Sequence, residues 1–264
     1  MSYLSLQDVC YSYDDEHNAV ENVSLDLELG EAVAIIGQNG AGKTTTVKMM
    51  NGLIRPSKGR VLLDGNDTNG ISVAKLSQHV GYVFQNPDEQ IFQDSVEKEI
   101  AFSLKKQKLS PVEIDTRVKD AATLCHLDKK LNEHPYNLPY SQRKFVTIAA
   151  IIAMDPEIMI FDEPTAGQDH SSIVRLNKII KKLTSMNKLV ITITHDMSFV
   201  VNNFEHVIVF AQAHKQKEGS PAEIFSDDAL LRKSKLEPPV IAQLAQKLGF
   251  DEALTIEDLV RAVN

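Results

Sequence analysis

Apolar and polar positions alternate along the start of the chain. The apolar side chains fall in two runs, and the acidic segment Asp14-Asp15-Glu16 separates them. A period of two is typical of a strand with one buried face, and a polar break between two such runs is typical of a turn. We therefore expect two antiparallel strands, whose apolar positions are Leu4, Leu6, Val9, Val20, Val23, Leu25, Leu27 and Leu29.

The next apolar segment does not alternate. Ala32 to Ile36 is a continuous apolar run that leads into a glycine-rich turn and a segment of helical composition. Such a run favours a strand that is buried on both faces of a parallel sheet. Strand-like runs return at 60–63, 80–84, 158–161, 189–194 and 206–210, with helical patterns at 73–77 and 169–185. The order strand, helix, strand predicts an α/β sheet with right-handed parallel crossovers.

A long helical segment interrupts this α/β pattern. The spacing is helical at about 95–154, where Ser110-Pro111-Val112-Glu113 supplies an N-cap, a first-turn proline and a capping-box glutamate for a helix to about residue 127. Beyond Pro238-Pro239 the spacing is helical again, and a second short helix begins at Thr255 with Asp258 in capping-box position. We expect a main domain at 1–227 with a helical insertion at about 95–154, and a helical extension at 228–264.

Composition narrows the function classes. A chain of 264 residues with 43% hydrophobic content can form a stable core. Its formal net charge of -8 argues against a dominant nucleic-acid-binding surface. Cys10 and Cys125 lack metal-ligand spacing, so we expect two reduced thiols. The apolar run from Phe145 to Met154 is too short to cross a membrane, and we expect neither a transmembrane segment nor a secretion signal.

One motif carries a specific chemistry. The segment from Gly37 to Thr44 matches G-x-x-x-x-G-K-[ST], follows the expected buried strand and opens a helix. In such a loop the backbone N–H groups surround phosphates, the lysine reaches the terminal phosphates and the threonine ligates magnesium. The sequence therefore predicts a site for ATP and Mg²⁺. Its candidate nucleotide-binding residues are Gly37, Gln38, Asn39, Gly40, Ala41, Gly42, Lys43, Thr44 and Thr45.

Two acids complete this predicted site. Asp162 and Glu163 follow the apolar strand at 158–161, at the edge of the sheet where the strand emerges. A phosphate-binding loop needs a carboxylate from a neighbouring strand to hold magnesium. We expect Asp162 to contact magnesium through water and Glu163 to polarise the attacking water as a general base.

The surrounding sequence resembles the ABC transporter ATPase family. FDEPTAGQD at 161–169 and THD at 194–196 have the order and spacing of that family's Walker B acids, D-loop and switch histidine. The resemblance covers about residues 3–227 and implies a P-loop NTPase (RecA-like) core with an N-terminal antiparallel β subdomain. It implies that His195 senses the γ-phosphate, that Gln85 is the Q-loop ligand that links magnesium to a transmembrane partner, and that Tyr13 stacks on adenine.

The D-loop departs from the family pattern at one position. By the same resemblance its residues include Gln168 and Asp169, and Gln168 stands where leucine is more common. This departure affects the segment by which the two ATPases of such a dimer signal to each other.

A narrower resemblance points to one branch of the family. FQNPDEQIF at 84–92, VEKEIAF at 96–102 and PPVIAQLAQKLGF at 238–250 look like the ATPase subunits of energy-coupling factor (ECF) transporters. There, two ATPases that are often non-identical lie beneath a membrane scaffold and energise vitamin or transition-metal uptake through a substrate-binding membrane subunit. The resemblance implies these partners and a peripheral place on the cytoplasmic face of a prokaryotic membrane. It also implies that the tail helices dimerise the ATPases, with an ordinary helical cap as the alternative.

The signature segment of this family is altered. In the family the signature of one ATPase, usually LSGGQ, completes the ATP site of the other, and here it reads Leu138-Pro139-Tyr140-Ser141-Gln142. Pro139 removes the signature hydroxyl and Ser141 replaces the last glycine, although the Ser141 N–H and the helix N-terminus remain available for a phosphate. We hypothesise an asymmetric heterodimer. In it, this chain's phosphate loop pairs with an intact signature on a sister ATPase.

Two other functions remain open. The altered signature and Gln168 also fit a nucleotide-binding regulatory subunit that hydrolyses ATP weakly, whereas Glu163 and His195 argue against it. A soluble ABC protein of translation or DNA repair fits less well. Such proteins usually carry two cassettes or a long coiled-coil insertion, and this chain has neither. The sequence therefore favours an ATP-hydrolysing subunit of an ECF-type importer.

Overall fold

The chain opens with an antiparallel sheet. The computed structural model describes residues 2–14, 17–250 and 252–263, so Asp15 and Glu16 of the expected turn lie outside the described residues. The strands on either side of that turn pair antiparallel, as expected, and the sheet order is β2-β1-β4-β5. Its strands are β1 (Leu4–Ser12), β2 (Asn18–Leu27), β4 (Lys58–Leu63) and β5 (Asn66–Asp67).

A second sheet forms the centre of the molecule, in the order β10-β9-β3-β8-β7-β6. Five of its strands are parallel, and β10 pairs antiparallel with β9. The strands are β3 (Ala32–Gly37), β6 (Val80–Val83), β7 (Ile158–Asp162), β8 (Leu189–Ile193), β9 (His206–Ala211) and β10 (His214–Gly219). The sequence does not predict β10, because this edge strand is polar throughout and has no buried residue.

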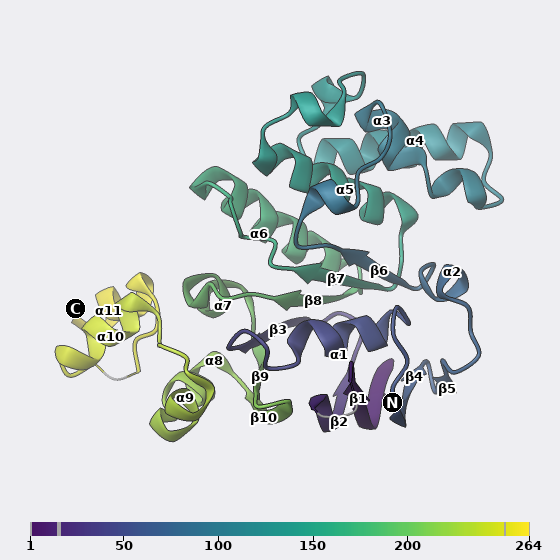
Figure 1. The fold of residues 1–264 in the computed structure, drawn as a ribbon. Helices are drawn as coiled ribbons and strands as arrows, with labels where there is room; N and C mark the ends of the chain where they lie inside the picture. The colour runs from purple at the N-terminus through teal and green to yellow at the C-terminus, as the bar shows by residue number, and fades with distance from the viewer. Residues whose placement is uncertain (1, 15–16, 251, 264) are drawn as a thin grey trace.

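The central sheet separates two hydrophobic cores. In β3, Val33 and Ile35 belong to one core, whereas Ala34 and Ile36 belong to the other. The first core also contains α1 (Lys43–Met50) and the antiparallel sheet, and the second contains the helices on the opposite face (Figure 1). Because both faces of β3 are covered, a continuous apolar run is the pattern that this strand requires.

The expected insertion is a group of helices at one end of the molecule (Figure 1). Its helices α3 (Val96–Ala101), α4 (Pro111–Leu124) and α5 (Tyr140–Met154) contact one another. The capping box at Ser110 is present, but α4 ends at Leu124 rather than near residue 127. The left-handed φ of 57° at His126 cannot continue a helix, which explains the early end.

The remaining helices lie between β5 and β6 and after β7, β8 and β10. The capping box between Thr255 and Asp258 is present at the start of α11. No described helix is long and apolar enough to cross a membrane. The helices are α2 (Val73–Leu76), α6 (His170–Ser185), α7 (Met197–Asn203), α8 (Pro221–Phe225), α9 (Asp228–Ser234), α10 (Val240–Lys247) and α11 (Ile256–Val263). Short 3₁₀ turns lie at Pro87–Glu89, Leu104–Lys106, Asp128–Lys130 and Pro135–Asn137.

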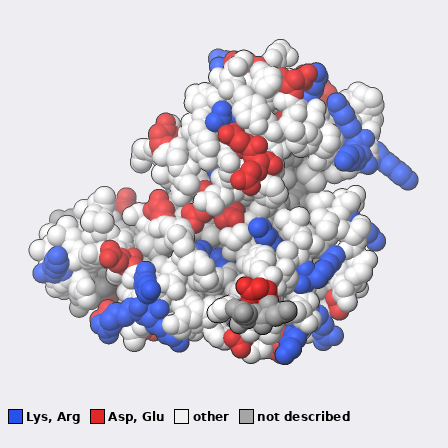
Figure 2. Space-filling model, in the orientation of Figure 1, with Lys and Arg blue, Asp and Glu red and all other residues white. Residues whose placement is uncertain are grey.

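Charge is distributed unevenly over the surface. Figure 2 shows acidic side chains gathered between the helical insertion and the body below it, while Lys and Arg lie mainly toward the edges of the same face. This face carries no single continuous basic patch (Figure 2). The distribution agrees with the net charge of -8.

Candidate functional site

The phosphate loop is the turn between β3 and α1, and its backbone requires glycine. Gly42 has a φ of 99°, and a Cβ atom there would lie 2.5 Å from the Ala19 carbonyl oxygen. At Gly37 a Cβ atom would lie 2.1 Å from the Phe210 carbonyl oxygen. Both positions therefore exclude a side chain. The motif glycines determine how closely this loop approaches β2 and β9.

Lys43 lies beneath this loop. Its side chain is buried, and Nζ donates hydrogen bonds to the carbonyl oxygens of Gly37 at 2.7 Å and Gln38 at 3.0 Å. Burial lowers the pKa of Lys43, while Glu163 and Asp162 favour its charged form. The ammonium group is thus held at the loop whose N–H groups are expected to receive phosphates.

Asp162 connects three neighbouring elements. It ends β7, and its Oδ2 accepts a hydrogen bond from Thr44 Oγ1 at 3.4 Å and one from the Tyr82 hydroxyl at 2.6 Å. Burial and the adjacent Asp162 raise the pKa of Tyr82 above its ordinary value. Hydroxyl and carboxylate oxygens are the donors that Mg²⁺ prefers, so Thr44 and Asp162 fit such an ion. Sequence reasoning missed Tyr82; its only signal is a hydroxyl within an otherwise apolar strand.

Glu163 and His195 form a pair at the carboxyl ends of β7 and β8. The His195 Nε2 and Glu163 Oε1 atoms lie 3.1 Å apart, and the His195 backbone N–H donates to Glu163 Oε2 at 3.3 Å. Burial raises the pKa of Glu163 to about 7 and lowers the pKa of His195 below its ordinary value. A carboxylate with a pKa near the working pH is suited to accept and release a proton.

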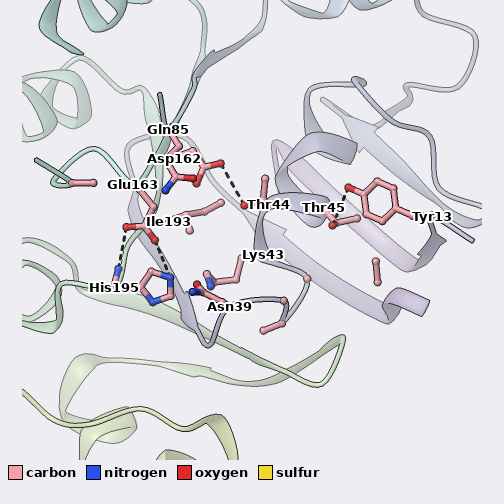
Figure 3. Close-up of a pocket in the computed structure, with 15 residues that line it drawn as sticks. Tyr13, Asn39, Lys43, Thr44, Thr45, Gln85, Asp162, Glu163, Ile193 and His195 are labelled. Atoms are coloured by element: carbon pink, nitrogen blue, oxygen red, sulfur yellow. Dashed lines mark hydrogen bonds and ion pairs between the residues drawn. The ribbon is translucent and has the colours of Figure 1, made fainter. Parts of the chain in front are cut away.

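These groups line one cavity of about 570 Å³ (Figure 3). Tyr13 lies at its rim with 62% of its surface exposed, and its hydroxyl oxygen is 3.3 Å from Thr45 Oγ1. Gly37 and Gln38 contribute through the carbonyl oxygens that contact Lys43 rather than by lining the cavity. The predicted site residues that line it are Tyr13, Asn39, Gly40, Ala41, Gly42, Lys43, Thr44, Thr45, Gln85, Asp162, Glu163 and His195.

The loop 138–142 does not join this cavity. None of Pro139, Tyr140, Ser141 and Gln142 is among its described lining residues. Pro139 instead precedes α5 as its N-cap without a side-chain hydrogen bond. A Cβ atom on Gly167 would lie 3.0 Å from Tyr140 Cε1, so the Tyr140 ring covers the segment that precedes α6. Within this chain, the expected signature lies apart from the phosphate loop.

The two D-loop residues also lie outside the cavity lining. Asp169 is the N-cap of α6 and accepts a hydrogen bond from the Ser172 N–H at 2.7 Å. Both polar side-chain atoms of Gln168 are buried without a hydrogen-bond partner among the described residues. Asp169 therefore has a role in starting the helix, whereas the amide group of Gln168 is left unsatisfied.

Lys144 is a second residue that sequence reasoning missed. It is completely buried in α5, and its Nζ donates to the carbonyl oxygens of Phe84 at 3.3 Å, Gln85, and Glu163 at 3.5 Å. Burial lowers the pKa of Lys144 to about 8. Its signal in the sequence is a charged residue among the apolar positions of a helix.

Comparison with known proteins decides the family. Residues 20–166 match the family described as ABC transporter. The chain belongs to the ABC transporter family. Among curated ABC relatives, a putative ABC transporter ATP-binding protein of Methanosarcina acetivorans is 40% identical over 97% of this chain, which spans 43% of that relative. A putative ABC transporter ATP-binding protein of Pyrococcus furiosus is 36% identical over 98% of this chain and 99% of its own length. The chain thus spans less than half of the first relative.

Solved ABC structures share the fold. The structure of cbiO1 from Clostridium perfringens, described as part of the ABC transporter complex cbiONQ, matches with a TM-score of 0.80 and 31% identity over 93% of this chain and 99% of that one. A dimeric ATP-binding cassette in a post-hydrolysis state with ADP and Pi matches with a TM-score of 0.75 and 26% identity over 83% and 98%. The resemblance to ABC ATPases and the expected P-loop fold are therefore confirmed.

Proposed function

We propose that this chain is the ATP-hydrolysing subunit of an ECF-type importer of a vitamin or a transition-metal ion. The observation that carries the proposal is the convergence of Lys43, Asp162, Glu163 and His195 in one cavity. Similarity to cbiO1, which is part of a cbiONQ complex, supports the ECF branch. The partners are a sister ATPase, a membrane scaffold and a membrane substrate-binding subunit. The chain is peripheral to the cytoplasmic face of a prokaryotic cell membrane.

The phosphate loop and its neighbours bind and orient ATP. The loop N–H groups and the Lys43 ammonium receive the β- and γ-phosphates, and Tyr13 lies at the rim where a base can stack. Thr44, Asp162 and Gln85 are the residues that would hold Mg²⁺. When bound there, the ion neutralises charge on the β- and γ-phosphate oxygens.

Glu163 and His195 act on the water that attacks ATP. Glu163 accepts the proton of this water as its oxygen bonds to the γ-phosphorus and the bond to the bridging oxygen breaks, which yields ADP and phosphate. With its lowered pKa, His195 is neutral and the one N–H of its imidazole donates to the γ-phosphate, while the His195 backbone N–H donates to the Glu163 carboxylate and keeps it in place. The reaction therefore needs only groups that already line one cavity.

A second ATPase completes the site. Because the loop 138–142 is separate from this cavity, the γ-phosphate requires a signature from another chain, as in a head-to-tail dimer. Similarity to a dimeric cassette bound to ADP and Pi supports this arrangement. The substitutions at Pro139 and Ser141 favour a non-identical sister with an intact signature. In this asymmetric heterodimer, the site that contains the loop 138–142 turns over slowly.

The helical extension supplies a surface for this dimer. Helices α10 and α11 carry exposed apolar side chains, which is unusual for a monomeric surface. We infer that they meet the corresponding helices of the sister ATPase. The exposed residues that support this role include Val240, Leu244, Leu248, Ile256 and Val263.

The membrane scaffold docks beside Gln85. A second cavity of about 370 Å³ adjoins the first, and it is lined by Leu53, Ile54, Phe84, Gln85 and Glu89. Because Gln85 lines both cavities, a scaffold segment in the second one is able to affect the nucleotide site. Motion passes from the closing dimer to the membrane through this groove.

The test is a comparison of two equivalent substitutions in the purified complex. Glu163→Gln in this chain is expected to lower ATPase activity about 10²-fold or more, as for loss of a general base. The equivalent change in the sister is expected to cost much less. Equal losses would contradict the asymmetric heterodimer. Activity that is indifferent to Lys43→Ala would favour the alternative function, a weakly hydrolysing regulatory subunit.

A further inference from the structure

A buried lysine links α5 to two loops of the proposed active site. The three N–H donors of the Lys144 ammonium meet three main-chain carbonyl oxygens, those of Phe84, Gln85 and Glu163. Its side chain is completely buried, so water cannot replace any of these acceptors. All the donors of the cation are therefore used within the protein.

The three carbonyl groups belong to the segments that carry the reactive side chains. Phe84 and Gln85 directly follow β6, whereas Glu163 directly follows β7. Glu163 also has a left-handed φ of 46°, a conformation that a non-glycine residue keeps only when its surroundings impose it. A hydrogen bond to its carbonyl oxygen is one such constraint.

Burial of the Lys144 ammonium is unfavourable in free energy unless its hydrogen bonds to the three carbonyl groups compensate. Burying an ammonium group requires compensating hydrogen bonds, and an apolar side chain of similar length avoids that cost altogether. Helix α5 has an apolar core-facing side, where Phe145, Val146 and Ile148 are buried. An apolar residue therefore suits position 144 for packing, and the ammonium is explained by the carbonyl groups that it holds.

We propose that Lys144 is a positioning residue that fixes the backbone of Gln85 and Glu163 for ATP hydrolysis and ties both to the helix that follows the loop 138–142. The inference rests on the proposed function, in which Glu163 is the general base. Lys144 acts through these two residues. It is more than 50 residues from Phe84 and Gln85 in sequence but bonds to both directly.

The test uses the full chain in complex with its sister ATPase. Lys144→Met removes the ammonium at similar length, and we expect kcat to fall about 10- to 100-fold while the KM for ATP changes less than about threefold. Nucleotide binding is retained because Lys43 and its loop are unchanged. Lys178→Met removes an exposed lysine from α6 and serves as the matched control, with kcat unchanged.

A double substitution separates positioning from a general packing defect. In a Glu163→Gln background, Lys144→Met is expected to cost much less activity than in wild type, because of the two residues that Lys144 positions only Gln85 still has its side chain. Lys144→Arg keeps the charge and the donors and is expected to restore most of the lost kcat. Lys144→Gln, which is neutral but still donates, provides the measurement if Lys144→Met does not fold.

Three results would overturn the inference. One is a kcat for Lys144→Met within twofold of wild type, the second is a parallel loss of kcat and ATP affinity, and the third is a multiplicative loss with Glu163→Gln. Each is distinguishable from failure of the proposed function. If the proposed function fails, the complex with Lys144 intact has the same ATPase activity with Glu163 as with Glu163→Gln.

Discussion

At the scale of single residues, the site is built from buried polar groups that hold one another in place. Asp162 accepts hydrogen bonds from Thr44 and Tyr82, and Glu163 contacts both the ring and the backbone N–H of His195. These contacts explain why the side chains have defined positions. A preorganised set of polar groups is what transition-state stabilisation requires.

Glu99 offers a pH-dependent test of the same principle outside the nucleotide site. Its buried Oε2 accepts hydrogen bonds from the N–H groups of Phe92 at 3.0 Å and Gln93 at 2.8 Å, and burial raises its pKa. Because the folded pKa exceeds the unfolded one, this group's contribution to stability is complete below the ordinary pKa of 4.5 and is lost as the pH rises through the folded value.

Glu99→Gln is expected to remove this pH dependence. The amide oxygen still accepts from both N–H groups, but no charge is desolvated. The urea midpoint of the variant therefore rises relative to wild type as the pH increases from 4.5 toward neutrality. Glu97→Gln, at an exposed position of the same helix, is the control. A difference between Glu99→Gln and wild type that stays constant with pH would contradict this explanation.

At the scale of elements, the pattern of apolar residues identifies buried strands, but it does not identify a strand with little buried surface. The apolar runs predict every parallel strand of the central sheet, but the polar edge strand β10 gives no such signal. Helices α10 and α11 show the opposite case. Their apolar spacing predicts a buried face, but several of these apolar side chains are exposed in this chain. The sister ATPase of the proposed dimer would cover these side chains.

Charged substitutions on α10 test this role. Leu244 and Leu248 lie one turn apart with 47% and 57% of their surfaces exposed. The pair Leu244→Lys and Leu248→Lys is expected to weaken association with the sister ATPase about 10-fold or more, because covering the exposed half of each leucine contributes roughly 1.5 kcal/mol or more in total. Thermal stability of the isolated chain changes little. Analytical ultracentrifugation measures the association.

The control places the same charge elsewhere on α10. Gln246→Lys lies on the opposite side of the helix from Leu244. We expect it to leave association unchanged. If the leucine variants bind the sister as tightly as wild type does, the extension is an ordinary helical cap.

At the scale of the whole molecule, the phosphate loop and the loop 138–142 lie in separate places. The phosphate loop and acids line one cavity, while the loop 138–142 begins α5 in the helical insertion. Each loop therefore contributes to a different composite site in the proposed dimer. In that proposal, the altered signature contacts the nucleotide of the sister ATPase, and Glu163 acts on the nucleotide bound to this chain.

Restoring the signature hydroxyl tests that division. In a complex that already carries Glu163→Gln, the proposal assigns the remaining activity to the phosphate loop of the sister ATPase. Pro139→Ser is expected to raise this activity roughly 10- to 150-fold, the value of one hydrogen bond to a charged group in the transition state. Pro139→Ala removes the ring without adding a hydroxyl and is expected to have little effect. No difference between the two variants would contradict the proposed role of position 139.

The sequence by itself determined the phosphate loop, the strand that precedes it and the acids after 158–161. These features are local: the glycines at 37 and 42 are required by their own backbone positions, and the apolar runs reflect burial of their own strands. The family and the P-loop fold follow from the same short segments.

Only the tertiary structure decided which groups meet. Thr44 and Asp162 are 118 positions apart, and in the sheet β8 lies between β3, which leads into the helix of Thr44, and β7, which ends at Asp162. Tyr82 reaches Asp162 because β6 and β7 pair in parallel, and Lys144 reaches Glu163 because α5 packs over the ends of these strands. No local pattern encodes such contacts, because they depend on how distant apolar faces pack together.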